Sequence, residues 1–250
     1  MNKKIIIKIG TESLADFNTS EKVRKMVSDI ARLIQEKIHV VLISSGAVWC
    51  GREIIAHETN KQVLAAVGQP ILMARYAEKF LKHNITTAQI LPTHALLEDG
   101  EHQKTFLQTL HSILQAWILP ILNENDPLST VEMRALGKWA DNDQNALLVA
   151  SLLNANNIVL ITNTNGVYSD KDNVSTRIKR LSSDIITESW MKTICGEKSS
   201  VWTGGMQSKL LVGKRFAENW WVTHICDGLT SWIWEHIMEQ EAKWWTIIQP

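Results

Sequence analysis

The chain has 250 residues, enough for one large domain or two small ones, and its 26 basic side chains balance 26 acidic ones. Balanced charge argues against nucleic-acid and membrane-surface partners, since proteins that bind either usually carry a basic excess. Three widely spaced cysteines make neither a disulfide framework nor a metal cluster, and the apolar run at 4–10 is too short for a signal-peptide core. We therefore expect a soluble, cytosolic protein.

Short β-branched runs alternate with helical patterns along the chain. In chain order we predict strand 4–10, helix 19–37, strand 39–47, helix 61–82, strand 86–93, helix 103–115, strand 118–126, helix 143–155, strand 157–163, helix 204–219, strand 221–228, helix 230–239 and strand 245–250. Strands separated by helices imply right-handed crossovers and a mainly parallel sheet with helices on both faces. The expected fold class is therefore α/β, a three-layer αβα sandwich.

Polar residues follow four of the predicted strands, at the carboxyl ends where such sheets bind ligands. They are Gly10-Thr11, Ser44-Ser45-Gly46, the run 123–126, and Thr162-Asn163. The turn at 44–46 offers hydroxyl groups, free amides and a helix start, which together suit an anion. Alone it is a weak signal, because Ser-Gly turns are common.

Lys8 lies inside the first predicted strand, where burial of an ammonium group costs free energy unless an anion meets it. Two interpretations stay open. The side chain either faces outward from an edge strand, or points at a phosphate bound beyond the strand's end. In the second case Gly10 would let the backbone approach the same ligand.

Two acid–amide clusters flank the longest polar connection, at 124–142. One contains Asn123 and Asp126, and the other is Asp141-Asn142-Asp143 at a predicted helix start. Simple N-capping is the alternative interpretation of the second cluster. An Asp side chain can hold the ammonium group of an amino acid, amide side chains can fix its carboxylate, and a further Asp can hold two lysines together.

A run of small and polar residues opens the helix predicted at 204–219; it is Thr203-Gly204-Gly205-Met206-Gln207-Ser208-Lys209. The free amides and the dipole of a helix N-terminus favour phosphate. The run lacks P-loop spacing, so we interpret it as a different phosphate cradle. Two lysines, anion turns and acid–amide clusters fit phosphoryl transfer, which needs positioning and positive charge on the transferring group.

With these residues identified, the chain resembles the amino acid kinase family over essentially its whole length, and most closely the members that phosphorylate glutamate. The motifs that carry the resemblance are IKIGT (7–11), SSGAV (44–48), GRE (51–53), KQVLAAVGQ (61–69), NEND (123–126), DND (141–143), LITNTNGVY (160–168) and TGGMQSKL (203–210). The resemblance implies the amino acid kinase fold as a single domain at 1–250, without the C-terminal PUA domain of many relatives. Within it, a part at about 1–150 would bind glutamate and a part at about 151–250 would bind ATP.

The resemblance also implies an activity: transfer of the ATP γ-phosphate, with Mg²⁺ accompanying ATP, to the side-chain carboxylate of L-glutamate. The product would be L-glutamyl 5-phosphate, in the first step of proline biosynthesis. By this resemblance Lys8 and Lys209 flank the transferring phosphate and Asp143 orients both lysines. Residues at glutamate-binding positions are Ser45, Asp126 and Asn142, with Asn123 and Asp141 as helpers. Residues at ATP-binding positions are Lys8, Thr162, Asn163, Thr203, Gly204, Gly205, Met206, Gln207, Ser208 and Lys209.

Other interpretations remain on the same fold. The chain could act on aspartate, acetylglutamate, carbamate or a nucleoside monophosphate, or it could be a non-catalytic ligand sensor. The paired acid–amide clusters favour free glutamate, and the presence of Lys8, Lys209 and Asp143 argues against a sensor. Eight scattered histidines indicate no metal site built from side chains. We also expect a homo-oligomer, a dimer or a tetramer.

Tryptophan is unusually frequent, with 11 Trp against 12 Gly, whereas glycine averages about 7% of ordinary chains. Several tryptophans occupy positions where glycine is common or fits: Trp49, Trp117, Trp139, Trp202, Trp221 and Trp245. We hypothesise that many of them stand for glycine. This would result if a gene that reads UGA as glycine were translated with a table that reads UGA as tryptophan. The alternative is a genuinely Trp-rich chain, in which Trp202 would crowd the predicted phosphate cradle.

Overall fold

The computed structural model describes residues 3–14, 16–93, 100–128, 142–170, 172–196, 205–229 and 245–250. The strands are β1 (Lys4–Ile9), β2 (His39–Ser44), β3 (Thr87–Ile90), β4 (Leu119–Leu122), β5 (Asn157–Ile161), β6 (Val167–Tyr168), β7 (Arg177–Ile178), β8 (Arg180–Ser182), β9 (Val222–Cys226) and β10 (Thr246–Gln249). The α-helices are α1 (Glu21–Gln35), α2 (Ala47–Ile54), α3 (Lys61–Leu81), α5 (Gly100–Gln115), α7 (Asn142–Leu153), α8 (Glu188–Cys195) and α9 (Met206–Ala217). Short 3-10 helices are η1 (Thr11–Leu14), η2 (Asp126–Leu128), η3 (Val174–Thr176) and η4 (Ser183–Ile185).

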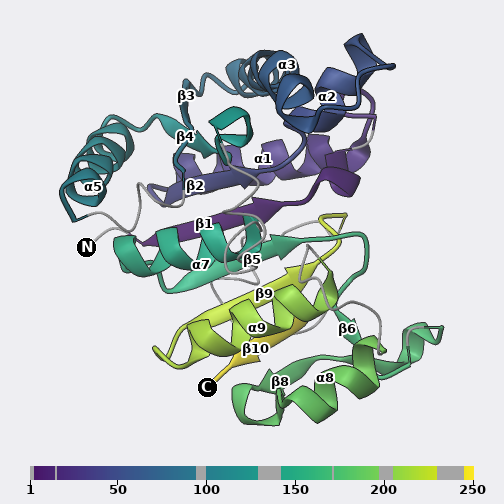
Figure 1. The fold of residues 1–250 in the computed structure, drawn as a ribbon. Helices are drawn as coiled ribbons and strands as arrows, with labels where there is room; N and C mark the ends of the chain where they lie inside the picture. Colours follow the sequence, from purple (N-terminus) through teal and green to yellow (C-terminus); the bar gives the residue numbers. More distant parts are fainter. Residues whose placement is uncertain are drawn as a thin grey trace.

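One large sheet organises the molecule, with strands in the order β3-β4-β2-β1-β5-β9-β10-β8 (Figure 1). Neighbouring strands are parallel throughout except for β9 and β10, which are antiparallel. The prediction of a mainly parallel α/β sheet is confirmed. Because β1 lies between β2 and β5, the segments that follow these three strands meet at one edge of the sheet.

Helices cover both faces of the sheet and enclose two hydrophobic cores. Ile5, Ile7 and Ile9 of β1 pack with residues of α1, α2 and α3, whereas Ile6 enters the core formed with α5, α7, α8 and α9. Successive side chains of a strand point to opposite faces, so Lys8 lies on the Ile6 side, facing α7 and α9. The expected three-layer αβα sandwich is thus confirmed. No helix in the described ranges is long and apolar enough to cross a bilayer.

Several predicted boundaries differ from the structure. The second and fourth strands end earlier than predicted, and α2 begins directly after the Ser-Ser-Gly turn. The segment 164–203, for which the sequence predicts no element, carries β6, β7, β8 and α8. Strands of two or three residues are too short to show a periodic pattern. The predicted helix at 230–239 lies outside the described residues.

Four helices, α1, α3, α5 and α7, end in the same backbone arrangement. A residue with left-handed φ is followed by one whose N–H bonds the carbonyl five residues earlier. This Schellman motif favours glycine or asparagine at its left-handed position. That position is Lys37 in α1, Asn84 in α3 and Asn154 in α7, but in α5 it is Trp117, with a φ of 58°. Trp220, which follows α9, has a φ of 63°. Left-handed backbone is strained for a bulky side chain, so these two positions support the glycine hypothesis.

Trp245 differs from these two positions, because its side chain fills the core. The residue is 0% exposed, and its indole Nε1 donates to His224 Nδ1 at 3.1 Å. Burial lowers the pKa of His224 to about 3, so the ring is neutral and can accept that bond. Trp49 and Trp221 are also packed, Trp49 beneath the Arg75 guanidinium and Trp221 against another ring. The positions 139 and 202 lie outside the described residues.

Candidate active site

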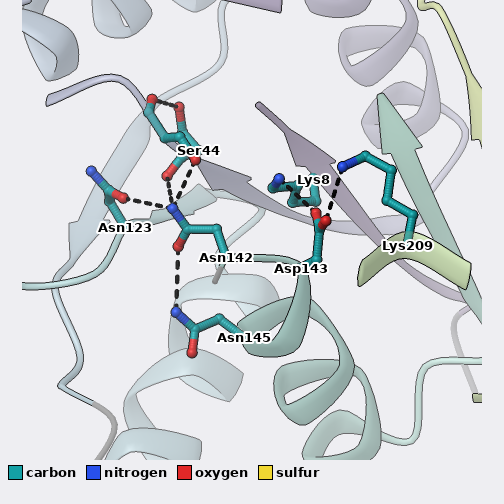
Figure 2. Close-up of polar contacts among 8 residues, drawn as sticks. Lys8, Ser44, Asn123, Asn142, Asp143, Asn145 and Lys209 are labelled. Atoms are coloured by element: carbon teal, nitrogen blue, oxygen red, sulfur yellow. Dashed lines mark hydrogen bonds and ion pairs between the residues drawn. The ribbon is translucent and has the colours of Figure 1, made fainter. Parts of the chain in front are cut away.

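Lys8, Asp143 and Lys209 meet inside the protein at the carboxyl end of the central strand. Lys8 comes from β1, while Asp143 and Lys209 come from the first turns of α7 and α9. Lys8 Nζ lies 2.5 Å from Asp143 Oδ1, and Lys209 Nζ lies 2.9 Å from Asp143 Oδ2 (Figure 2). The three residues are 3%, 0% and 4% exposed. One buried carboxylate therefore holds two ammonium groups, an arrangement we call the triad.

The triad carries one net positive charge. Burial by itself would raise the pKa of the Asp143 carboxyl, but the charges of Lys8 and Lys209 outweigh burial and hold the pKa below its ordinary value. Asp143 is therefore ionised at neutral pH and cancels only one of the two ammonium charges. Excess buried charge is unfavourable unless an anion shares the site. The interpretation that Lys8 faces outward from an edge strand is wrong, because β1 is central and Lys8 is buried.

A second group of polar side chains, the amide cluster, surrounds Asn142. Its Nδ2 lies 2.8 Å from Ser45 Oγ, 3.3 Å from Asn123 Oδ1 and 3.4 Å from the Ser44 carbonyl. Asn142 Oδ1 in turn accepts a bond from Asn145 Nδ2 at 3.3 Å. Three segments far apart in the sequence, at the ends of β2 and β4 and the start of α7, thus converge on one side chain.

The triad and the amide cluster are neighbours, because Asn142 and Asp143 are consecutive residues of α7. Figure 2 shows Asn142 turned toward Asn123 and Ser44, and Asp143 turned toward Lys8 and Lys209. The N-terminus of α7 adds its partial positive charge to the same region. The arrangement can hold a small polar molecule through amides and a hydroxyl, with one end next to two ammonium groups.

The structure shows less about two other residues that the resemblance assigns to glutamate binding. Asp126 opens η2, which packs against α3. Two residues separate Asp126 from Asn123, so Asp126 is close to the amide cluster along the chain. Asp141 lies outside the described residues.

Thr162 and Asn163 follow β5 and are tied to the segments after β1. Lys22 Nζ donates to the Thr162 carbonyl at 3.0 Å, and Asn163 Nδ2 donates to Glu12 Oε2 at 2.7 Å. Ser13 Oγ donates to Asn163 Oδ1 at 3.3 Å. Glu12 and Lys22 were not predicted as site residues, because pairing across more than a hundred residues leaves no local signal in the sequence.

The predicted phosphate cradle is described from Gly205 onward, and Thr203 and Gly204 lie outside the described residues. Gly205 is the N-cap of α9, and a β-carbon there would meet no atom within 4 Å. The first turn of α9 contains Met206, Gln207 and Ser208, whose backbone amides precede the first intrahelical bonds. The same turn carries Lys209, so the helix start and the triad belong to one region.

Side-chain clusters that could hold a metal ion are absent from the described parts of the chain: no three His, Cys, Asp or Glu residues converge there. Both carboxylate oxygens of Asp143 are engaged by lysines.

Comparison with known proteins agrees with this architecture. A sequence profile described as the amino acid kinase family matches residues 3–226. The glutamate 5-kinase of Shouchella clausii (strain KSM-K16) is 36% identical over 226 residues, which cover 86% of this chain and 59% of that protein. The glutamate 5-kinase of Chlorobaculum tepidum is 31% identical over 240 residues, which cover 92% of this chain and 65% of that protein. This chain thus spans about three fifths of the length of these relatives.

Solved structures show the same fold at low sequence identity. The carbamate kinase from Giardia lamblia bound to AMP-PNP superposes with a TM-score of 0.69 at 16% identity, covering 99% of this chain and 98% of that one. The profile match, the fold and the order of the strand-end motifs lead to one conclusion. The chain belongs to the amino acid kinase family.

Proposed function

We propose that this protein is a glutamate 5-kinase, which transfers the γ-phosphate of ATP to the side-chain carboxylate of L-glutamate. The product, L-glutamyl 5-phosphate, would enter proline biosynthesis. The observation that carries the proposal is the buried triad lying directly beside the amide cluster. The names of the relatives that share 31% and 36% identity support glutamate as the acceptor.

The amide cluster would hold the amino acid. Ser45, Asn142 and Asn123 supply hydroxyl and amide groups for a carboxylate, and Asp126 and Asp141 supply negative charge for the ammonium group. These contacts would bind the amino acid equally well in the ground state and in the transition state, so they would position it without lowering the barrier themselves. Their place next to Asp143 would bring the side-chain carboxylate of glutamate toward the two lysines.

The triad would stabilise the transferring phosphoryl group. Phosphoryl transfer requires little covalent help and depends on positioning and electrostatic stabilisation. Lys8 and Lys209 would place positive charge on the phosphoryl oxygens. Asp143 would act as a positioning residue, since one carboxylate holding both ammonium groups sets their separation.

The nucleotide would lie over the carboxyl ends of β5 and β9 and the start of α9. Thr162 and Asn163 would contact it, and the run 203–209 would hold its phosphates with backbone amides. Mg²⁺ binds few protein ligands and several phosphate or water oxygens in nucleotide sites. An ion held mainly by ATP and water oxygens would not require a cluster of protein ligands. The ion would neutralise charge on the phosphates.

The same proposal assigns two parts to one domain. The amide cluster draws on residues before 150, whereas the strand ends and helix assigned to ATP follow residue 150. We further propose that the protein acts in the cytosol and assembles as a dimer or a tetramer.

The test is an acyl-phosphate assay with hydroxylamine, which traps glutamyl phosphate as a hydroxamate. We expect a product that requires ATP, Mg²⁺ and L-glutamate together. Phosphorylation of aspartate, carbamate or a nucleotide, without a glutamate-dependent product, would overturn the substrate assignment. Binding of glutamate or ATP without any phosphoryl transfer would indicate a non-catalytic ligand sensor instead of a kinase.

A further inference from the structure

Gln69 in α3 is buried against the amide cluster and has one half of its amide unused. The residue is 7% exposed, and its Oε1 accepts a bond from Asn123 Nδ2 at 2.8 Å. Its Nε2 is buried, and within the part of the chain that the structure describes it has no hydrogen-bond partner. A buried donor without an acceptor is destabilising, because it has lost its hydrogen bond to water and gained none in the protein.

The orientation of the Gln69 amide follows from backbone groups whose roles are fixed. The Glu124 N–H can only donate, and it lies 2.9 Å from Asn123 Oδ1. Asn123 must therefore present Nδ2, a donor, to Gln69. Gln69 must accept this hydrogen bond with its side-chain oxygen, because the reverse orientation would place two NH₂ groups face to face. Its free end is consequently a donor, and its missing partner is an acceptor.

The helix that carries Gln69 is fixed in place at the preceding residue. A β-carbon on Gly68 would lie 1.9 Å from the Ala47 carbonyl oxygen and 2.3 Å from the Gly51 nitrogen. The backbone of α3 is therefore in direct contact with that of α2, at the turn that also carries Ser45. Close backbone packing therefore fixes the position of the Gln69 backbone relative to α2 and the turn before it.

We propose that Gln69 Nε2 donates a hydrogen bond to the α-carboxylate of the amino-acid acceptor, the carboxylate that is not phosphorylated. The inference rests on the proposed function. The reacting carboxylate belongs beside the triad, on the Asp143 side of Asn142. Gln69 lies on the opposite side of Asn142, where it is hydrogen-bonded to Asn123. A bound carboxylate oxygen supplies the acceptor that the amide lacks, and hydrogen bonds to charged groups are stronger than neutral ones.

Two variants test the donor. Gln69→Glu keeps an oxygen for Asn123 and replaces only Nε2, and Gln69→Met removes both polar atoms without adding charge. Glutamate affinity is measured by calorimetry without nucleotide, and KM for glutamate and ATP by the hydroxamate assay. We expect glutamate affinity to fall roughly 10- to 100-fold in both variants, with KM for ATP and kcat little changed. The matched control is Gln108→Glu, on the exposed side of α5, which should leave every value unchanged.

An acceptor analogue separates binding from a structural role. 4-Aminobutyrate retains the reacting carboxylate and the amino group of glutamate but lacks the α-carboxylate. Its affinity should be the same in the wild-type protein and in Gln69→Met, whereas a disturbed site would weaken both ligands equally. Unchanged glutamate affinity in both Gln69 variants would overturn the assignment while leaving the kinase proposal intact. A wild-type protein that neither binds nor phosphorylates glutamate would overturn both.

Discussion

Replacing Trp220 by glycine should stabilise the protein, because the backbone at this position already has the conformation that glycine prefers. Trp220 has a φ of 63° and its side chain is 83% exposed, so its removal sacrifices little packing. A left-handed conformation costs an L-residue about 1–2 kcal/mol. Glycine loses about 0.5–1 kcal/mol more conformational entropy on folding. The difference predicts a gain of about 0.5–1 kcal/mol in the free energy of unfolding, or ~1–4 °C in Tm.

The opposite result is expected for Trp245→Gly. This variant empties a fully buried site and removes the partner of His224 Nδ1. Truncation of a buried aromatic side chain costs about 3–5 kcal/mol. The two variants therefore separate a tryptophan that strains the backbone from one that fills the core.

Urea unfolding followed by far-ultraviolet circular dichroism measures both effects, since tryptophan fluorescence would change with the substitution itself. A lower denaturation midpoint for Trp220→Gly, at unchanged slope, would refute the reasoning from backbone strain. Peptide mass spectrometry of the protein from its own cells addresses the glycine hypothesis directly. Tryptophan at positions 117 and 220 in those peptides would refute the glycine hypothesis.

Further predictions concern the site and its surroundings. Lys209→Ala should lower kcat about 100-fold or more with little change in glutamate affinity, and an unchanged rate would remove Lys209 from the site. Asp143→Asn should lower activity and reduce the free energy of unfolding by about 3–5 kcal/mol, because two buried ammonium groups would lose their counter-charge; chemical denaturation tests this. Asn163→Asp should raise KM for ATP, because it places a second carboxylate against Glu12. Adding Glu12→Gln should return KM for ATP to the wild-type value. If KM for ATP stays high, the contact between these two residues does not govern ATP binding. Burial raises the pKa of Asp29 from 3.8 to about 6, so this carboxyl group ionises more readily in the unfolded chain and the free energy of unfolding falls as pH rises through that range. Asp29→Asn should therefore stabilise the protein by up to about 3 kcal/mol well above pH ~6 and not below pH ~4, and an equal effect at both pH values would contradict this sign.

Much of the fold was predictable from local patterns. Strands buried on both faces of a parallel sheet appear as continuous β-branched runs, which is why β1, β2 and β5 are evident in the sequence. Apolar residues at helical spacing likewise indicate α1. The strands β6 to β8 were missed, because two or three residues cannot show a period and their stability comes from tertiary pairing.

The site was predictable in composition and only partly in arrangement. A lysine inside a predicted buried strand and an acid–amide cluster at a predicted helix start identified Lys8, Asn142 and Asp143 as candidates. The role of Gln69 left only a faint signal, a polar residue on the buried face of α3. Its unpaired donor becomes visible only beside Asn123, which lies 54 residues later in the chain.

The sequence by itself determined the fold class, the residues available for chemistry and the family to which the chain belongs, because each depends on local periodicity or on motif order. Tertiary structure alone decided that β1 is central, that one carboxylate of α7 holds lysines from β1 and α9, and that the amide cluster continues to α3. It also divided the tryptophans, placing Trp220 in strained, exposed backbone and Trp245 in the core. These outcomes depend on strand order and on contacts between distant segments, which no local pattern encodes.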